Sequence, residues 1–189
     1  MEYLSQGNQR QRKAYEILTE TSIFEVFGEY TPILVGTIPI DIDISSSDLD
    51  IICEVHDFEE FEQLLVQCFQ EMSMFYISKR TVQDIPRIVC SFQYKKWAIE
   101  IFGQPIPTLE QNGYKHMIIE KRLLKILGEE TKEIIRELKR SGLKTEPAFG
   151  ELLRIDGNIY EKLIEMYDWD DQELWEWTLR SHKSYKGVN

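Results

Sequence analysis

Apolar side chains recur every three to four positions between residues 57 and 72, which is the clearest helical pattern of the chain. The stripe consists of Phe58, Phe61, Leu64, Leu65, Cys68, Phe69 and Met72. A first helix is predicted near the start of the chain, because Asn8 and Gln11 have the spacing of a capping box. A short second helix is predicted over "SIFEVF" and ends at Gly28. These patterns place helices on both sides of the first predicted strands.

Five segments have the composition and alternation of β-strands. The first is "TPILVGT", which has a proline at its start and a glycine near its end. The second is "SDLDIICEV", and the others are "MFYISKRTV", "RIVCSFQY" and "WAIEIFG". From Tyr114 onward the sequence has helical character, with breaks near Gly128, residues 142–147, Gly157 and residues 168–171. The chain therefore predicts a strand-rich middle followed by a helical C-terminal half.

Short turns between the later strands favour a mixed or antiparallel sheet, so the expected fold class is α+β rather than doubly wound α/β. We expect helices to flank this sheet and a helical extension to follow it. The change of character after "QPIPTLEQNG" predicts two parts. Residues 1–107 form the α+β core, and residues 108–189 form a helical subdomain packed on it.

Composition narrows the class of function without identifying it. The chain has 189 residues, 42% of them hydrophobic, and this is typical of a globular protein. A net charge of −11 argues against broad binding of nucleic acid, whose affinity comes mostly from neutralised phosphates. Three cysteines, no long apolar run and no signal-peptide pattern lead us to expect a reduced, cytoplasmic protein without a membrane partner.

Four aspartates lie within ten residues, at positions 41, 43, 48 and 50. A calcium loop of the EF-hand type that starts at Asp41 is excluded. Its sixth residue would be Ser46 instead of glycine, and its twelfth would be Ile52 instead of glutamate. An acidic, exposed strand edge that discourages aggregation explains Asp41 and Asp43. It explains Asp48 and Asp50 less well, since a strongly apolar strand follows them.

A divalent metal site explains the second pair of aspartates. Asp48 and Asp50 stand two positions apart on a strand, so both project from the same face and lie close enough to share an ion. Glu100 lies between two isoleucines in a later strand and projects from the face opposite them. A salt bridge from Glu100 to Arg87 or Lys95 is the structural alternative to a metal-binding role.

A Gly–Thr pair ends the first predicted strand. Gly36 lets the backbone approach a ligand closely, and the hydroxyl and amide of Thr37 are suited to phosphate oxygens. The significance of this pair comes from its position shortly before the aspartates.

These motifs, in this order, resemble the nucleotidyltransferase superfamily of the polymerase-beta type. The resemblance rests on Val35-Gly36-Thr37, then Asp48-Leu49-Asp50-Ile51, then Ile99-Glu100-Ile101. More narrowly, "LVGTIPIDI", "SDLDIIC" and "KTEPAFG" are similar to a small bacterial family of unknown function within that superfamily. The chain departs from the superfamily pattern at Thr37, where Ser or Gly is usual.

The resemblance implies a nucleotidyltransferase-like core and a metal-dependent transfer of a nucleoside monophosphate from a nucleoside triphosphate to a hydroxyl group. Asp48, Asp50 and Glu100 would be the catalytic, metal-binding residues, with Mg²⁺ or Mn²⁺ as the cofactor. Gly36 and Thr37 would bind the nucleotide by positioning its β- and γ-phosphates. The acidic charge favours a small molecule or a protein as acceptor over a long nucleic acid.

A different class of function fits other features of the chain. A catalytically inactive member of the superfamily would use the same fold as a regulatory or partner-binding module. Thr37 and the Trp-rich C-terminal segment, with Trp169, Trp175 and Trp177, favour this alternative. Phosphoester hydrolysis by the same metal ions ranks last. The basic side chains of Lys121, Arg122 and Lys125 fit an ordinary solvated helix face or a contact with phosphate.

Overall fold

A computed structural model describes residues 1–186 of the chain. The chain divides into two compact units. The sheet unit comprises residues 1–39 and 47–114, and the helical unit comprises residues 40–46 together with the chain from residue 115 onward. The expected division into residues 1–107 and 108–189 stays a prediction about domains. The observed units differ from this division in one respect. The loop of residues 40–46, from the N-terminal half of the chain, belongs to the helical unit.

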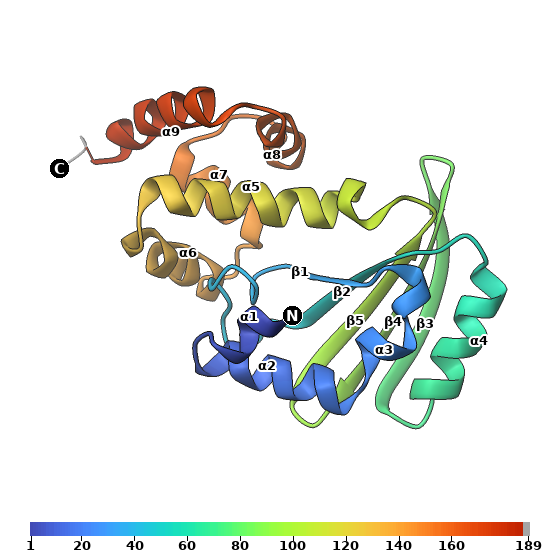
Figure 1. Ribbon diagram of the computed structural model, residues 1–189. Helices are drawn as coiled ribbons and strands as arrows, with labels where there is room; N and C mark the ends of the chain where they lie inside the picture. The colour runs from blue at the N-terminus through green and yellow to red at the C-terminus, as the bar shows by residue number, and fades with distance from the viewer. Residues whose placement is uncertain (187–189) are drawn as a thin grey trace. The chain divides into compact units, whose positions relative to one another are not determined.

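The sheet unit is built on five strands. They are β1 (Ile33–Val35), β2 (Leu49–Glu54), β3 (Ser73–Val82), β4 (Ile85–Tyr94) and β5 (Trp97–Gln104), in the order β1-β2-β5-β4-β3 (Figure 1). β2 pairs with β5 in parallel, and every other neighbouring pair is antiparallel. The sheet is therefore mixed, and the α+β class expected from the sequence is confirmed.

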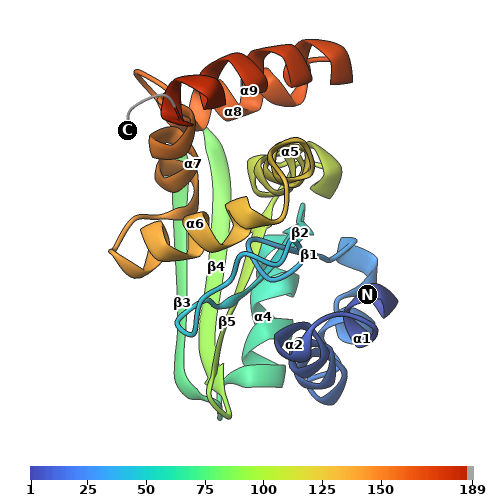
Figure 2. The same cartoon turned by 90° about the vertical axis from the view of Figure 1, so that its left-hand side faces the viewer.

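The helices of the sheet unit that contribute to its core are α1 (Glu2–Ser5), α2 (Gln9–Glu20), α3 (Ile23–Val26) and α4 (Phe58–Phe69). The unit also contains two short 3-10 helices, η1 (Gly28–Tyr30) and η2 (Thr108–Glu110). The predicted capping box is present at the start of α2, where the side chains and backbone amides of Asn8 and Gln11 bond reciprocally. Asp57 caps α4 by accepting from the amides of Glu59 and Glu60. α2 and α4 lie on the same side of the sheet in Figure 2.

The core lies between these helices and the sheet. On β5, Trp97, Ile99 and Ile101 are buried, whereas Ala98 is exposed and Glu100 is half-buried on the other face. Aromatic rings fill the helix side of the sheet; Phe69 and Phe92, for example, stack with centroids 4.4 Å apart. The face of the sheet that carries Glu100 is named the carboxylate face below. Because the apolar residues alternate along β4 and β5, the polar residues of these strands collect on the carboxylate face.

The helical unit contains α5 (Asn112–Leu127) from residue 115 on, α6 (Glu130–Arg140), α7 (Thr145–Leu153), α8 (Ile159–Tyr167) and α9 (Asp171–Lys186). Its fully buried side chains include Ile42, Ile119, Leu123, Ile135, Phe149, Leu152, Leu163 and Leu174. None of the helices within the described residues has the length and apolar character required to cross a membrane.

Residues 40–46 form a turn and loop, not a strand, and this loop bonds to α6. The carboxylate of Asp41 pairs with Arg136 at 2.7 Å and with Lys132 at 3.2 Å. Lys139 donates to the carbonyl oxygen of Ile42 at 3.0 Å. The interpretation of Asp41 and Asp43 as an acidic strand edge is therefore wrong. These aspartates precede β2 in a segment whose backbone carbonyls bond to basic side chains of α6 instead of to a neighbouring strand.

Candidate functional site

Two of the three predicted carboxylates lie side by side in the sheet unit. Asp50 on β2 and Glu100 on β5 are register partners in the parallel pairing of these strands, so both project from the carboxylate face. Both are half-buried. Asp48 comes just before β2 and is exposed. The register thus joins carboxylates that are 50 positions apart in the sequence.

Gly36 approaches the Asp50 carboxylate from the opposite side. It follows β1, whose last residue, Val35, pairs with Asp50. A Cβ atom at Gly36 would lie 2.6 Å from Oδ2 of Asp50, and the φ of Gly36 is +78°. Both observations require glycine, because a side chain would collide with the carboxylate and would be strained in the left-handed region. The backbone at the end of β1 is therefore held directly against a carboxylate.

Thr37 faces a second hydroxyl. Its Oγ1 lies 3.3 Å from Oγ of Ser47, the last residue before Asp48. Two side chains of α2 position the segments that carry these hydroxyls. Gln11 donates to the carbonyl oxygen of Ile38 at 2.9 Å, and Arg10 donates to that of Ser47 at 3.0 Å. The turn after β1 and the segment before β2 are thus both bonded to α2.

Arg10, Gln11 and Ser47 were missed by reasoning from the sequence. The guanidinium of Arg10 lies over the ring of Trp97, 4.0 Å from its centroid, which fixes it beside the segment before β2. Gln11 was interpreted as part of a capping box alone. Of the three, only Ser47 could have been predicted from the sequence as a site residue, because it carries a hydroxyl group directly before the Asp–x–Asp motif.

The electrostatic environment of Glu100 disfavours its ionised form. Burial raises the pKa of Glu100 above its ordinary value, the charge of Asp48 raises it further, and the charge of Arg80 opposes both effects. The sequence suggested Arg87 or Lys95 as a salt-bridge partner for Glu100. Lys95 instead pairs with Glu20 at 2.6 Å. A cation bound between the carboxylates would therefore relieve a repulsion that this arrangement contains.

The donor set fits a hard cation that arrives together with phosphate. Among the side chains that the structure describes, no three of His, Cys, Asp or Glu are arranged to hold a metal ion by themselves. Mg²⁺ does not require such a cage, because it usually binds through one or two carboxylates together with substrate phosphates and water. Asp50 and Glu100 supply hard oxygen donors side by side. The sharing of one ion by Asp48, Asp50 and Glu100 stays a prediction.

Other polar residues noted in the sequence form bonds within the helical unit. Arg122 donates to the carbonyl oxygens of Tyr167 and Trp169 and pairs with Asp171 at 2.9 Å. Its guanidinium therefore joins α5 to the α8–α9 connection.

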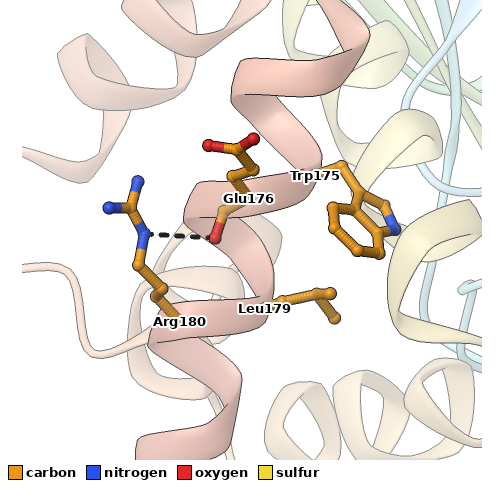
Figure 3. A pocket seen from close by; sticks show the side chains of 4 residues that line it. All are labelled: Trp175, Glu176, Leu179 and Arg180. Carbon is orange, nitrogen blue, oxygen red and sulfur yellow. Dashed lines mark hydrogen bonds between the residues drawn. The ribbon is translucent and has the colours of Figure 1, made fainter.

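A shallow depression lies along α9, lined by Trp175, Glu176, Leu179 and Arg180 (Figure 3). All four side chains come from this one helix, and the Arg180 Nε donates to the carbonyl oxygen of Glu176 at 3.3 Å. The depression contains none of the predicted site residues. Its position on a single helix surface makes it a poor site for chemistry.

Comparison with protein families places the chain. Residues 16–166 match the family described as "Domain of unknown function (DUF4269)". The chain belongs to this family. Its bacterial distribution, expected from the resemblance of short motifs, stays a prediction. No curated protein matches the chain.

Solved structures identify the type of fold. A Cid1 poly(U) polymerase variant bound to MgATP matches with a TM-score of 0.50 and 12% identity, covering 84% of this chain and 48% of that one. A cytoplasmic RNA terminal U-transferase matches at 0.49 and 10%, covering 84% and 47%. The polymerase core of TRAMP, an RNA surveillance complex, matches at 0.48 and 12%, covering 99% and 62%.

At these identities the likeness concerns the fold alone, and the chain spans about half the length of the Cid1 structures. The fold is of the nucleotidyltransferase type, as the motifs implied.

Proposed function

We propose that this protein is a metal-dependent nucleotidyltransferase. It transfers a nucleoside monophosphate from a nucleoside triphosphate to a hydroxyl group of a small molecule or a protein. The observation that carries the proposal is the contact between the Gly36 backbone and the Asp50 carboxylate, with Glu100 in register beside it. This contact places a glycine turn suited to phosphate next to carboxylates suited to a divalent cation.

The side chains of the sheet unit divide the work of the reaction. Asp48, Asp50 and Glu100 would hold Mg²⁺ or Mn²⁺, which would neutralise phosphate charge and lower the pKa of the acceptor hydroxyl. Gly36 and Thr37 orient the β- and γ-phosphates, so that the α-phosphorus faces Glu100. The acceptor oxygen forms a bond to the α-phosphorus as the bond to the pyrophosphate oxygen breaks. Pyrophosphate leaves, and the hydroxyl proton passes to water. Positioning and charge neutralisation supply most of the rate enhancement.

The choice of acceptor rests on charge. The solved structures with this fold include a poly(U) polymerase and an RNA terminal U-transferase. This chain spans about half the length of those structures, and it carries a net charge of −11. Because binding of a long nucleic acid depends on neutralised phosphates, a small molecule or a protein is the favoured acceptor.

A catalytically inactive regulatory or partner-binding module is the second candidate. It is favoured by one observation, a large aromatic side chain exposed on α9. Trp175, whose side chain is 49% exposed on α9, would then contribute to a partner surface.

Calorimetry separates the two candidates. ATP and the other nucleoside triphosphates are titrated into the protein with Mg²⁺ or Mn²⁺, in parallel with the Asp50→Asn variant. The matched control is Asp84→Asn, which removes the same charge from an exposed turn between β3 and β4. We expect binding that requires the metal, survives in the control and is lost in Asp50→Asn. Failure of the folded wild-type protein to bind any triphosphate would reject the transferase and favour the inactive module.

A further inference from the structure

A row of side chains crosses four strands on the carboxylate face. Asp50 pairs with Glu100, Glu100 with Ser91, and Ser91 with Tyr76, so that one residue from each of β2, β5, β4 and β3 stands in line. Directly paired residues project from the same face of a sheet. Gly36 and the triphosphate site proposed above lie at one end of this row, and Tyr76 lies at the other. Tyr76 is 64% exposed, so its ring is accessible.

Two arginines project from the same face beyond this row. Arg80 on β3 and Arg87 on β4 are direct cross-strand partners. Arg87 lies four residues from Ser91 along β4. At roughly 3.3 Å per residue, their Cα atoms are about 13 Å apart, and the distance between the side-chain ends depends on how each extends. Like charges placed directly opposite each other destabilise a sheet. The fold retains this arrangement on a face where a single anion would neutralise both guanidinium groups.

Neither arginine is held in a close ion pair, although the charge of Arg80 acts on Glu100 from a greater distance. Within the described part of the chain, neither guanidinium has an ion-pair partner within 4 Å, and the buried Nε of Arg87 has no hydrogen-bond acceptor. Their neighbour on β3, Lys79, points to the helix side of the sheet and pairs with Glu62 of α4 at 2.6 Å. The two arginines therefore remain available to an external anion. Lys79 does not, because it is paired on the other face of β3.

We propose that Arg80 and Arg87 bind a phosphate group of the acceptor, and that this acceptor is a small phosphorylated molecule with its reactive hydroxyl at Glu100. This inference rests on the proposed function, because Glu100 marks the reaction centre only if the protein is a transferase. Planar, multidentate guanidinium groups match phosphate oxygens well. A phosphorylated sugar or nucleotide extends from Glu100 past Ser91 to the arginines.

The position of the pair separates it from the triphosphate. Across the sheet the order is β1, β2, β5, β4, β3, so Gly36 and Asp50 lie on one side of Glu100 and both arginines lie on the other. A donor nucleotide held by Gly36 and Asp50 and an acceptor held by Arg80 and Arg87 would thus approach Glu100 from opposite sides. The donor and the acceptor would therefore occupy separate parts of the carboxylate face.

The test measures binding, not turnover. Ribose 5-phosphate, which has hydroxyl groups and one phosphate, is titrated by ³¹P NMR into the full chain. Three variants are compared: Arg87→Gln, Arg80→Gln and the control Lys79→Gln. Arg80→Gln guards against misfolding because Arg80 is exposed, and Lys79→Gln removes one positive charge from the other face of β3. Binding of Mg²⁺–ATP to each variant is measured separately by calorimetry.

We expect each arginine variant to bind ribose 5-phosphate at least tenfold more weakly than the wild type, while the control and the affinity for Mg²⁺–ATP remain unchanged. An equal loss of ATP affinity in the arginine variants would assign the pair to the triphosphate and overturn the inference, with the transferase intact. Absence of ribose 5-phosphate binding would also overturn it. A short oligoribonucleotide is titrated in the same way. If its binding depends on the arginines and ribose 5-phosphate does not bind, the acceptor is an RNA end and not a small molecule. If the wild-type protein does not bind Mg²⁺–ATP, the proposed function itself is rejected.

Discussion

The backbone of Gly36 and the carboxylate of Asp50 are in contact across β1 and β2, with 2.6 Å between Oδ2 of Asp50 and the position that a Cβ atom would take. The two residues belong to different motifs of the sequence, a Gly–Thr turn and an Asp–x–Asp pair. Antiparallel pairing of Val35 with Asp50 brings the motifs together. Their contact makes the conformation of the turn and the orientation of the carboxylate depend on each other.

Substitution of Gly36 by alanine should therefore impair both folding and binding. The left-handed φ of Gly36 alone is expected to cost about 1–3 kcal/mol of unfolding free energy in a residue with a side chain. The collision with Asp50 should also lower the affinity for Mg²⁺–ATP at least tenfold. Urea unfolding and calorimetry measure the two effects.

The control for this substitution is Gly28→Ala, because a Cβ at Gly28 meets no atom within 4 Å. We expect that variant to unfold and bind as the wild type does. Unchanged nucleotide affinity in a folded Gly36→Ala protein would mean that the Gly36–Asp50 contact takes no part in a binding site.

The buried carboxyl group of Glu120 on α5 should make stability depend on pH. The pKa of Glu120 is raised well above its ordinary value by burial first and by the charge of Glu146 second, while Lys139 opposes these effects. The folded protein then keeps a proton that the unfolded chain releases near pH 4.5, so the free energy of unfolding falls as the pH rises from there through the folded pKa.

The Glu120→Gln variant lacks this titration. Its stability relative to the wild type should therefore increase between pH 4 and pH 8, as measured by urea unfolding at several pH values. Glu137→Gln, which changes an exposed residue of α6, is the control and should follow the wild type across the range. A constant difference between Glu120→Gln and the wild type at every pH would contradict the assignment.

The three free cysteines should differ in reactivity towards a thiol reagent. Burial raises the pKa of Cys53 and of Cys90 to about 12, and both side chains are fully buried, whereas Cys68 on α4 is partly exposed. Because the thiolate is the reactive form, the native protein at pH 8 should be labelled at Cys68 first, and at Cys53 and Cys90 only after unfolding. The number of reactive thiols is measured by the colour that an aromatic disulfide reagent releases. The Cys68→Ser variant should release no colour while it is folded. Two or more equivalents released without denaturant would be inconsistent with the buried positions.

Local pattern was sufficient to predict the secondary structure and the faces of its elements. The apolar stripe between residues 57 and 72 became α4, and the alternation of Trp97, Ile99 and Ile101 correctly placed Glu100 on the face opposite the core. These predictions succeed because helices and strands have fixed periods of their own. The choice of Gly36, Thr37, Asp48, Asp50 and Glu100 as candidates also came from local motifs, and their roles stay predictions.

The contacts between distant segments were decided by tertiary structure alone. Nothing near Asp50 in the sequence specifies that it aligns with Glu100, that Arg80 is the cation acting on Glu100, or that Asp41 bonds to Arg136. Strand register follows from the burial of one whole face of the sheet, and a shift by one residue would turn every side chain of a strand to the opposite face. The sequence by itself determined which residues can act and which way each one points within its element. Only the packing of the complete sheet determined which of them meet.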